Sequence, residues 1–471
     1  MKLKSIVAEA LWFSVILVKT HAFSSIGSNI GFTDETIGPA VQLYLHNETK
    51  AVKLYGSISS WNVTMVTNMS YLFSSSNFNK PLDSWDVSNV KDMSYMFQNS
   101  NFNQHLTTWD VSRVENMSGM FMGTSWQLRP DYNQPLTDWN VSGVKDMSYM
   151  FQYSKYNQPL SNWDVSNVED CSYMFKYSWF NQPLTNWTLG SSTKHMFSYS
   201  SFNQPMIEWD VSNVKDMSYM FSFSNFNQPL TDWDASNVED CSYMFRSSEF
   251  NQPLTNWTLG SSTRHMLSLS KLNKALSDWD VSSVEDMSYM FRSSRFNKPL
   301  SDWDVSNVKD MSYMFFASMF NQPLSEWDSS QVYDMSGMFH SSSFNQPMTD
   351  WNTSGLLEAT NMFFNARDFD QKLCWSWDKT DVSVDDLALE TTAGSNRETE
   401  CEVDSKTAGF QLSNLILGCS LFAVSAPLVL FVHRFHKRQG NLKTQENVST
   451  NHRTEHCPKT NFVSTSREQD I

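Results

Sequence analysis

The chain has 471 residues and a formal net charge of −16 at pH 7. The charge is uneven, because the first 22 residues carry +2 and the last 39 carry +3, which leaves −21 for the residues between. Such an acidic central part excludes a nucleic acid as the partner, since binding phosphate groups needs a basic surface. Six cysteines in a chain of this length exclude a disulfide-rich scaffold.

Residues 1–22 are predicted to be a secretory signal peptide. Two lysines lie among the first four residues, residues 6–18 are mostly apolar, and Thr20-His21-Ala22 precedes a cut at Phe23. A membrane anchor is the alternative, although the apolar run is short for one. A cut directly before Phe23 also suits a presequence directed to a plastid.

Residues 23–58 are predicted to form a helical N-terminal cap. Apolar side chains recur at helical spacing between Ala40 and Tyr55, and Gly56 ends the segment. A solenoid exposes its core at an open end, so an amphipathic helix is expected to cover the first repeat.

Residues 59–365 contain thirteen units, each marked by one tryptophan. Successive tryptophans are 24 residues apart, except for two gaps of 22 and one of 30. A fixed period of this size predicts a solenoid, in which each unit buries its apolar face only against its neighbours. The tryptophans are Trp61, Trp85, Trp109, Trp139, Trp163, Trp187, Trp209, Trp233, Trp257, Trp279, Trp303, Trp327 and Trp351.

Two short elements are predicted within each unit. The phrase from Leu160 to Val168 has the spacing of a leucine-rich repeat. Trp163 and Val165 alternate with a polar residue, which predicts a short strand. Asp170 precedes apolar residues at helical spacing, which predicts one helical turn with Asp170 as its N-cap.

An asparagine recurs at the corner that follows. We expect its amide to bond turn backbone groups of its own and the adjacent coil, where water cannot reach them. The series is Asn79, Asn103, Asn133, Asn157, Asn181, Asn203, Asn227, Asn251, Asn273, Asn297, Asn321 and Asn345.

The 30-residue unit carries an insertion between Met122 and Asp131. An insertion into a solenoid coil projects as a loop. Trp126 and Arg129 within it favour a contact site. The alternative is a loop without function, whose tryptophan folds back on the array.

A polar column is predicted to point outward from the strands. Stacked about 4.8 Å apart, equal charges repel, so something must offset the cost. Three possibilities are open: an Asx-type turn to the residue two positions on, a divalent cation between rungs, or a basic partner. The column is Asp86, Asp110, Asn140, Asp164, Thr188, Asp210, Asp234, Thr258, Asp280, Asp304, Asp328 and Asn352.

Four of the cysteines belong to the array or its end. Cys171 and Cys241 each replace the first Met of a repeated Met-Ser-Tyr-Met-Phe run, three units apart. That separation, about 14 Å, is too long to bridge, so both are predicted to be buried thiols. Cys374 and Cys401 flank the end of the array and are predicted to form a disulfide.

The C-terminal part predicts a membrane anchor. Residues 366–378 are interpreted as a C-terminal cap and 379–411 as an acidic stalk. Residues 412–432 carry no charge and as a helix would be about 31 Å long, enough to span a bilayer. Basic residues follow at once and mark the cytoplasmic side, so 433–471 is predicted to be a cytoplasmic tail. The signal and this flank together predict a single-pass type I protein of the cell membrane with its repeats outside, although an internal membrane is also open.

Asparagines in the N-x-S/T pattern are glycosylation candidates on an extracellular array. Asn68 and Asn116 among them take the predicted helix-cap position, where a glycan would crowd the cap. The candidates are Asn47, Asn62, Asn68, Asn116, Asn140, Asn186, Asn256 and Asn352.

The fullest unit, Phe226 to Phe245, reads FNQPLTDWDASNVEDCSYMF. It resembles the repeats of the BspA-like leucine-rich-repeat surface proteins, and the resemblance extends over residues 40–378. It implies a cell-surface solenoid with a role in adhesion or partner binding, and no catalytic residues. The insertion, the two short units and the membrane anchor depart from the family pattern.

We therefore expect an α+β repeat solenoid, leucine-rich-repeat-like and right-handed. Each unit is expected to have one short parallel strand and one helical turn, between a helical N-terminal cap and a single transmembrane helix.

The expected function is non-enzymatic recognition or adhesion of an extracellular protein or glycan, without cofactor or metal. Catalysis needs one differentiated constellation, whereas the repeated carboxylates are equivalent copies. The alternatives are a structural surface or wall component and the ligand-binding subunit of a receptor complex. Candidate ligand-binding residues are Trp126, Arg129, Asp164, Asp210, Asp234, Asp280, Asp304 and Asp328.

Overall fold

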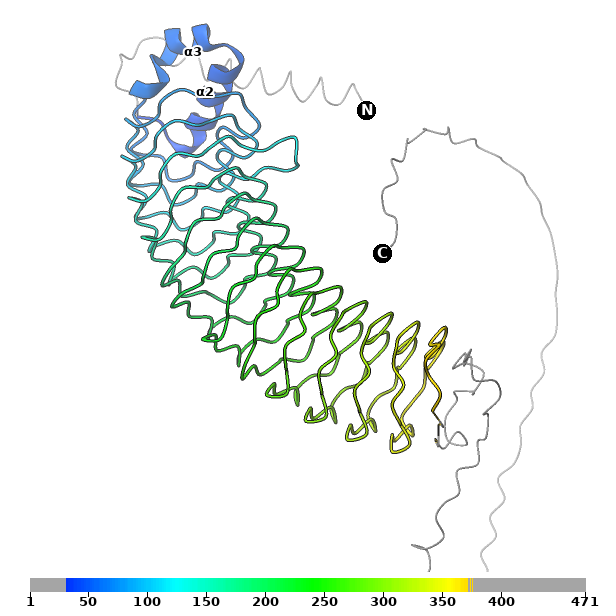
Figure 1. Cartoon of the computed structure of the whole chain (residues 1–471). Coiled ribbons are helices and arrows are strands. Elements are labelled where there is room, and N and C mark those ends of the chain that lie inside the picture. The colour runs from blue at the N-terminus through cyan, green and yellow to red at the C-terminus, as the bar shows by residue number, and fades with distance from the viewer. Residues whose placement is uncertain (1–30, 372, 374, 376–471) are drawn as a thin grey trace, which may run out of the picture. The chain divides into compact units, whose positions relative to one another are not determined.

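The computed structural model describes residues 31–371, 373 and 375. Helices α2 (Asp34–His46) and α3 (Glu48–Tyr55) and the short 3-10 helix η1 (Ile58–Ser60) come first. Coils of the repeated units then follow one another in a bent stack (Figure 1). The helices lie within the range in which the sequence predicts a helical cap.

Local sequence signals start and orient helix α2. Thr33 precedes the helix, and its backbone N–H donates to Thr36 Oγ1 at 2.9 Å, one half of a capping box. Asp34 and Glu35 in the first turn favour the positive end of the helix dipole. The buried residues of α2 are Ile37, Ala40, Val41 and Tyr44.

The cap stands in for a preceding coil. The Asp34 carboxylate accepts hydrogen bonds from the backbone N–H groups of Thr67 and Asn68, at 2.7 and 3.0 Å. In the next coil, the equivalent N–H groups of residues 91 and 92 donate instead to Thr67 O. Tyr44 packs edge-on against Trp61, with ring centroids 6.1 Å apart. The cap therefore satisfies both the backbone and the core of the first coil.

The predicted helical turn of each unit is wrong. The N–H groups of Cys171, Tyr173 and Phe175 donate to the next coil, at 3.0, 2.8 and 2.9 Å, instead of back along their own chain. Tyr173 has a φ of +62°, which an α-helix cannot accommodate. Asp170 is therefore not a helix cap but forms a parallel bridge to Ser192 in the next coil.

The predicted strand is also wrong. Residues 163–165 connect two turns, which close where Trp163 N donates to Leu160 O at 3.1 Å and Val168 N donates to Val165 O at 3.0 Å. Parallel pairing within the described residues is limited to isolated bridges, most of them one per coil at the position of Asp170. The repeats are therefore neither helical nor sheet-like, and their regularity lies in side-chain columns.

The core consists of aromatic columns whose spacing widens across each coil. Ring centroids of the Phe97–Phe121 column are 5.5–5.9 Å apart. Those of the corner column that contains Phe180 are 6.1–6.4 Å apart. On the opposite side, surface rings that include Tyr219 are only 4.2–4.9 Å apart. Unequal spacing bends the stack (Figure 1). Because the tyrosine rings are the most closely spaced, their side is its inner face.

The asparagine prediction is confirmed by the hydrogen bonds. Each Asn Oδ1 accepts the backbone N–H of the asparagine in the next coil, as from Asn181 to Asn157 at 2.9 Å and from Asn251 to Asn227 at 2.8 Å. The column continues to Asp370, whose N–H donates to Asn345 Oδ1 at 3.0 Å. One side chain per coil thus satisfies one backbone donor at this corner.

The tryptophan column joins coils in a second way. Most indole N–H groups donate to a carbonyl of the preceding coil, as Trp109 does to Leu82 O at 2.9 Å. Trp375, within the range predicted as the C-terminal cap, stacks on Trp351 at 6.4 Å and donates to Met348 O at 2.8 Å. The described part of that range therefore extends the column.

The two short units depend on glycine. A Cβ on Gly190 would lie 2.1 Å from Val168 O, and one on Gly260 would lie 2.3 Å from Val238 O. The shorter path after the tryptophan brings the backbone against the preceding coil, where only glycine fits.

Cys171 and Cys241 are free and buried, as predicted. Burial raises the pKa of each thiol well above its usual range. The predicted signal peptide, stalk, transmembrane helix, tail and Cys374–Cys401 disulfide lie outside the described residues. In the part of the chain that is described, no helix is long and apolar enough to cross a membrane.

The variants Trp279→Phe and Trp257→Phe separate the two contributions of the tryptophan column. Trp279 Nε1 donates to Leu254 O at 2.9 Å, whereas the buried Nε1 of Trp257 has no acceptor. Both changes shrink the ring, but only the first leaves a carbonyl unsatisfied. We expect Trp279→Phe to cost about 1–3 kcal/mol more, measured by native-state amide hydrogen exchange of the affected coils. Equal losses would show that the indole hydrogen bond contributes nothing.

Candidate functional site

Left-handed residues carry a column of rings along the inner face. We call these residues the inner ladder, and all have φ between +55° and +62°. That conformation is less stable for an L-residue by about 1–2 kcal/mol. Stacking of neighbouring rings stabilises the folded state by about 0.5–1.5 kcal/mol per pair and so offsets much of this cost. Gly119 and Gly337 hold the same position at φ +58°. The inner ladder is Tyr71, Tyr95, Tyr149, Tyr173, His195, Tyr219, Tyr243, His265, Tyr289 and Tyr313.

The two histidines of the inner ladder are neutral rungs. Burial, and next the nearby Lys176, lower the pKa of His195 to about 3. Burial and nearby arginines lower the pKa of His265 to about 4. Both imidazoles are therefore uncharged at neutral pH and stack as the tyrosines do, which fits turn residues better than bases.

A shorter row of rings lies beside the inner ladder. Tyr153, Tyr177, Tyr199 and Phe223 follow four residues after its rungs, also at positive φ. Each is stacked on the next with centroids 4.5 Å apart. Tyr199 is 38% exposed and Phe223 36%, so the ring edges face solvent.

The insertion folds onto this row. The Trp126 ring lies edge-on to Tyr153 and Tyr177, with centroids 5.8 and 5.3 Å away. The Arg129 guanidinium lies 3.9 Å from the Trp126 centroid and 5.2 Å from that of Trp179. Its Nη2 donates to Tyr177 O at 3.1 Å, while the buried Nε and Nη1 have no acceptor. We call these five residues the aromatic patch.

The structure shows the folding back of the insertion, and a contact site there stays a prediction. Trp126 folds back on the array, yet it remains 57% exposed, and Trp179 is 52% exposed. Sequence reasoning missed Trp179. Aligning the units would have revealed it, because equivalent positions such as Asn101, Ser201 and Glu249 are polar.

Cations on the inner face lie over rings instead of beside carboxylates. Lys176 Nζ is 4.9 Å from the Tyr173 centroid, and Arg246 Cζ is 5.2 Å from that of Phe223. Arg264 and Arg292 lie similarly over Tyr289 and Phe316, at 5.8 and 5.2 Å. Among the described residues, none of these four has an ion-pair partner. We call them, with Arg129, the basic strip.

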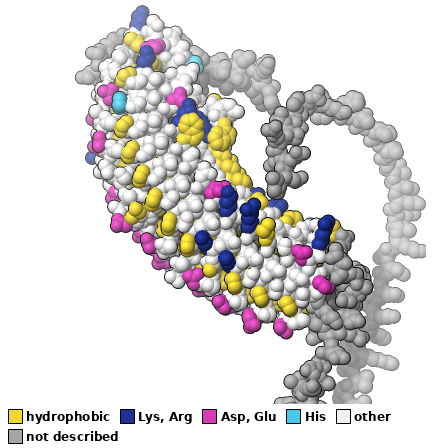
Figure 2. Space-filling view, in the orientation of Figure 1, with side chains coloured by type: hydrophobic (Ala, Val, Ile, Leu, Met, Phe, Trp, Pro, Cys, Tyr) yellow, Lys and Arg dark blue, Asp and Glu magenta, His cyan; other side chains and the backbone are white. Residues whose placement is uncertain are grey.

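Charge is segregated on the surface. Figure 2 shows Lys and Arg side chains gathered with hydrophobic ones near the concave edge, while most Asp and Glu side chains follow the convex edge. Elsewhere in the described part of the chain, seven lysines are paired with carboxylates, as Lys309 is with Glu285 at 2.8 Å. The acidic chain therefore presents one face that is aromatic and basic.

Each outward carboxylate accepts a hydrogen bond from the serine two residues on in its own coil. The N–H of Ser166 donates to Asp164 Oδ1 at 3.1 Å, and Ser212 donates its N–H and hydroxyl to Asp210 Oδ1 at 3.0 and 2.6 Å. Hydrogen bonds from serine lower the pKa of these carboxyls. The same turn holds Asp234, Asp280, Asp304 and Asp328. Of the three possibilities, the structure shows the Asx turn.

The candidate ligand-binding residues do not form one site. Trp126 and Arg129 are in contact, whereas the aspartates lie one per coil in a different segment. No group of three His, Cys, Asp or Glu residues within the described ranges could hold a metal ion.

The glycosylation candidates differ in geometry. Asn62, Asn140 and Asn352 accept the N–H two residues on, which leaves the amide nitrogen exposed. Asn68 and Asn116 make the same turn at the bridge position. The remaining three are exposed: Asn47, at the N-cap of α3, and Asn186 and Asn256, at φ +58°.

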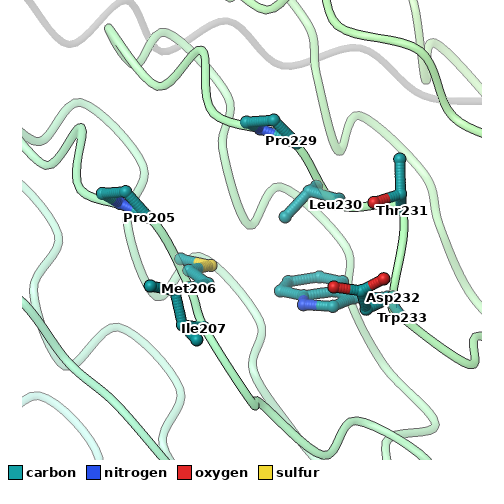
Figure 3. A pocket seen from close by; sticks show the side chains of 8 residues that line it. All are labelled: Pro205, Met206, Ile207, Pro229, Leu230, Thr231, Asp232 and Trp233. Carbon is teal, nitrogen blue, oxygen red and sulfur yellow. The ribbon is translucent and has the colours of Figure 1, made fainter.

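A small cavity of about 200 Å³ lies beside Trp233 (Figure 3), which stays stacked on Trp209 with ring centroids 6.2 Å apart. It lies between Pro205-Met206-Ile207 of one coil and residues 229–233 of the next. The buried Nε1 of Trp233 has no acceptor, unlike Nε1 of Trp209, which donates to Leu184 O at 3.0 Å. The cavity is a packing defect in a repeated contact.

Comparison with known families identifies the repeats. Residues 45–129, 100–200, 191–269, 263–343 and 316–398 match the family described as "Mycoplasma protein of unknown function, DUF285". The overlapping matches cover most of the chain, so the protein belongs to this family and consists of tandem copies of its repeat. No curated protein and no solved structure matches the chain.

The left-handed backbone of the inner ladder can be tested at Tyr219. Tyr219→Ala and Tyr219→Gly both lose the stacked ring, but only glycine relieves the φ of +59°. We expect the glycine variant to be about 1 kcal/mol more stable, measured as the unfolding midpoint in urea. At exposed Asn225, which lacks a positive φ, the order should reverse. The same order at both positions would contradict the assignment.

The Asx turns predict acid sensitivity. The folded pKa of Asp164, Asp210, Asp234 and Asp280 lies below the ordinary value of 3.8. Their contribution to stability is therefore fully present above pH 3.8 and is lost as pH falls through the folded pKa. Replacing all four by Asn, as Asn140 already stands in the column, should flatten the fall in melting temperature between pH 5 and pH 2. An unchanged slope would contradict this role.

Proposed function

We propose that the protein is a non-enzymatic recognition or adhesion protein that presents a leucine-rich-repeat-like solenoid of the BspA-like kind at the cell surface. The observation that carries the proposal is the inner face, where the aromatic patch and the basic strip are exposed or half-buried side chains of an acidic chain.

The composition of this face supports binding. Trp, Tyr and Arg are enriched among residues that dominate binding energy. Their contacts are also pre-arranged, because the ladders hold each ring in a stack, so little conformational entropy is lost on binding. Stacked units give solenoids a long concave surface for an extended ligand.

The membrane arrangement is part of the proposal. Residues 1–22 would direct secretion, 412–432 would anchor the chain, and 433–471 would lie in the cytoplasm. Intact cells carrying a tag after Phe23 and another after Ile471 would be treated with protease. Loss of the first tag with a small membrane-bound fragment keeping the second supports a type I surface protein. Survival of both tags until the cells are permeabilised contradicts the surface location.

Binding through the inner face is tested with full-length protein in detergent, titrated onto intact cells that lack it. The double variant Trp126→Ala and Trp179→Ala should weaken saturable binding about tenfold or more, because two exposed anchors are removed. Asp210→Thr with Asp280→Thr is the control: threonine already occupies the column at Thr188 and Thr258, keeps a side-chain oxygen and creates no N-x-S/T pattern, so this variant should bind as the unaltered protein does.

Two results would contradict the proposal. A loss confined to the aspartate variant would move binding to the outward column. The absence of any saturable binding would favour a structural component of the surface.

A further inference from the structure

Three arginines lie in a row on consecutive coils of the inner face. Tyr243, His265 and Tyr289 are successive rungs of the inner ladder, with ring centroids 4.6 and 4.3 Å apart. Arg246 follows the first rung by three residues, Arg264 directly precedes the second, and Arg292 follows the third by three. Stacking of the rungs therefore brings the three side chains onto one part of the surface.

All three charges lie near His265, the middle rung. After burial, Arg246, Arg264 and Arg292 are the groups that lower the pKa of this imidazole. Arg264 and Arg292 also act on the neighbouring Tyr289. No carboxylate contributes at His265, so the local charge is positive in an otherwise acidic molecule.

Nearby carboxylates do not neutralise the group. Asp240 and Asp286 each accept the N–H of the serine two residues on, at 2.8 Å. Glu249 pairs with Lys271 at 2.5 Å, and Glu285 with Lys309 at 2.8 Å. None of the three arginines has an ion-pair partner among the described residues.

Unused donors lie at the same place. The buried Nε of Arg246 has no acceptor. Ser268 lies on the coil between those of Arg246 and Arg292, and its buried hydroxyl also has no partner. Ser198, the copy of Ser268 in the preceding block, is equally unpaired where the three arginines are absent, so the serine does not distinguish this part of the array. The guanidinium groups themselves are the donors that an anion would meet.

We propose that Arg246, Arg264 and Arg292 bind the sulfate or carboxylate groups of an acidic polysaccharide. Guanidinium groups match such oxyanions in a two-pronged geometry that lysine cannot supply. The inference rests on the proposed function, since it names the ligand class of the same inner face.

The backbone argues for a polysaccharide over a peptide. One mode by which an extended peptide binds is the addition of its backbone to a free edge of paired backbone. Here the N–H groups of the inner ladder are used between coils, as from Tyr243 to Arg264 O at 2.8 Å and from His265 to Ser288 O at 3.0 Å. Side chains alone remain for recognition, and exposed rings such as Trp179 and Phe223 along the same face offer surfaces for sugar rings.

The test uses purified full-length protein in detergent and three polymers: dextran sulfate, polygalacturonate and neutral dextran. Binding to at least one acidic polymer, weakened by added salt, and no binding to neutral dextran is expected. Binding of dextran sulfate alone would assign the site to sulfate esters, and binding of polygalacturonate alone to carboxylates. Binding of neither would overturn the proposal.

Variants with equal charge changes locate the site. The triple change Arg246→Gln, Arg264→Gln and Arg292→Gln should weaken binding about tenfold or more. The control Lys215→Gln, Lys271→Gln and Lys309→Gln removes three paired cations and should leave affinity within about twofold, since paired surface charges contribute little. Replacing the arginines by lysines should restore part of the affinity. Equal losses in both glutamine variants would overturn the site.

The cell-binding assay separates this proposal from the function it rests on. If the arginine variant still binds cells while it loses dextran sulfate, the polysaccharide is not the cell ligand, and its assignment fails while surface recognition stands. If unaltered protein binds dextran sulfate but no cells, the arginine site stands and surface recognition fails.

Discussion

Backbone hydrogen bonds between successive coils determine the rest of this structure. Tyr219 and Phe221 donate to the next coil at 2.9 and 3.0 Å, and the pattern repeats from coil to coil. These donors face along the stack only because residues such as Tyr219 adopt a left-handed conformation, which no helix or strand would require. The conformational cost is offset by ring stacking, so the inner ladder and the backbone pairing depend on each other. Because pairing holds the coils close on this side while the rings of the Phe180 corner column lie 6.1–6.4 Å apart on the other, the stack bends.

The bend and the ladders together create the candidate binding surface. Lys176 and the arginines lie over the faces of the neighbouring stacked rings. The carboxylates that form ion pairs do so with other lysines. The insertion adds Trp126 and Arg129 at one end of the same row, where Trp179 completes a sandwich around the guanidinium. The carboxylates, by contrast, are each held in a turn by a serine of their own coil, and they contribute to local structure instead of gathering into one site.

Repetition explains both the regularity and the exceptions. Residues 171–195 and 241–265 correspond position by position, so Lys176 and Lys194 have their counterparts in Arg246 and Arg264. The third arginine, Arg292, corresponds to Ser222, so only the second block has three guanidinium groups together. Glycines at residues 190 and 260 show the same duplication at the level of the backbone, because the same shortened path needs the same missing Cβ.

Sequence alone determined the solenoid, its period, the asparagine column, the buried cysteines and the helical range of the cap, because each follows from spacing and burial repeated many times. It also identified Trp126 and Arg129 as a contact candidate. It could not determine the conformation within a unit: an apolar pattern at i, i+3 and i+4 describes a helical turn and a left-handed turn equally well, and pairing with the next coil decides between them. The convergence of Arg246, Arg264 and Arg292 and the partnership of Arg129 with Trp179 were likewise decided by tertiary structure, since stacking brings together residues separated by 18–50 positions in the chain.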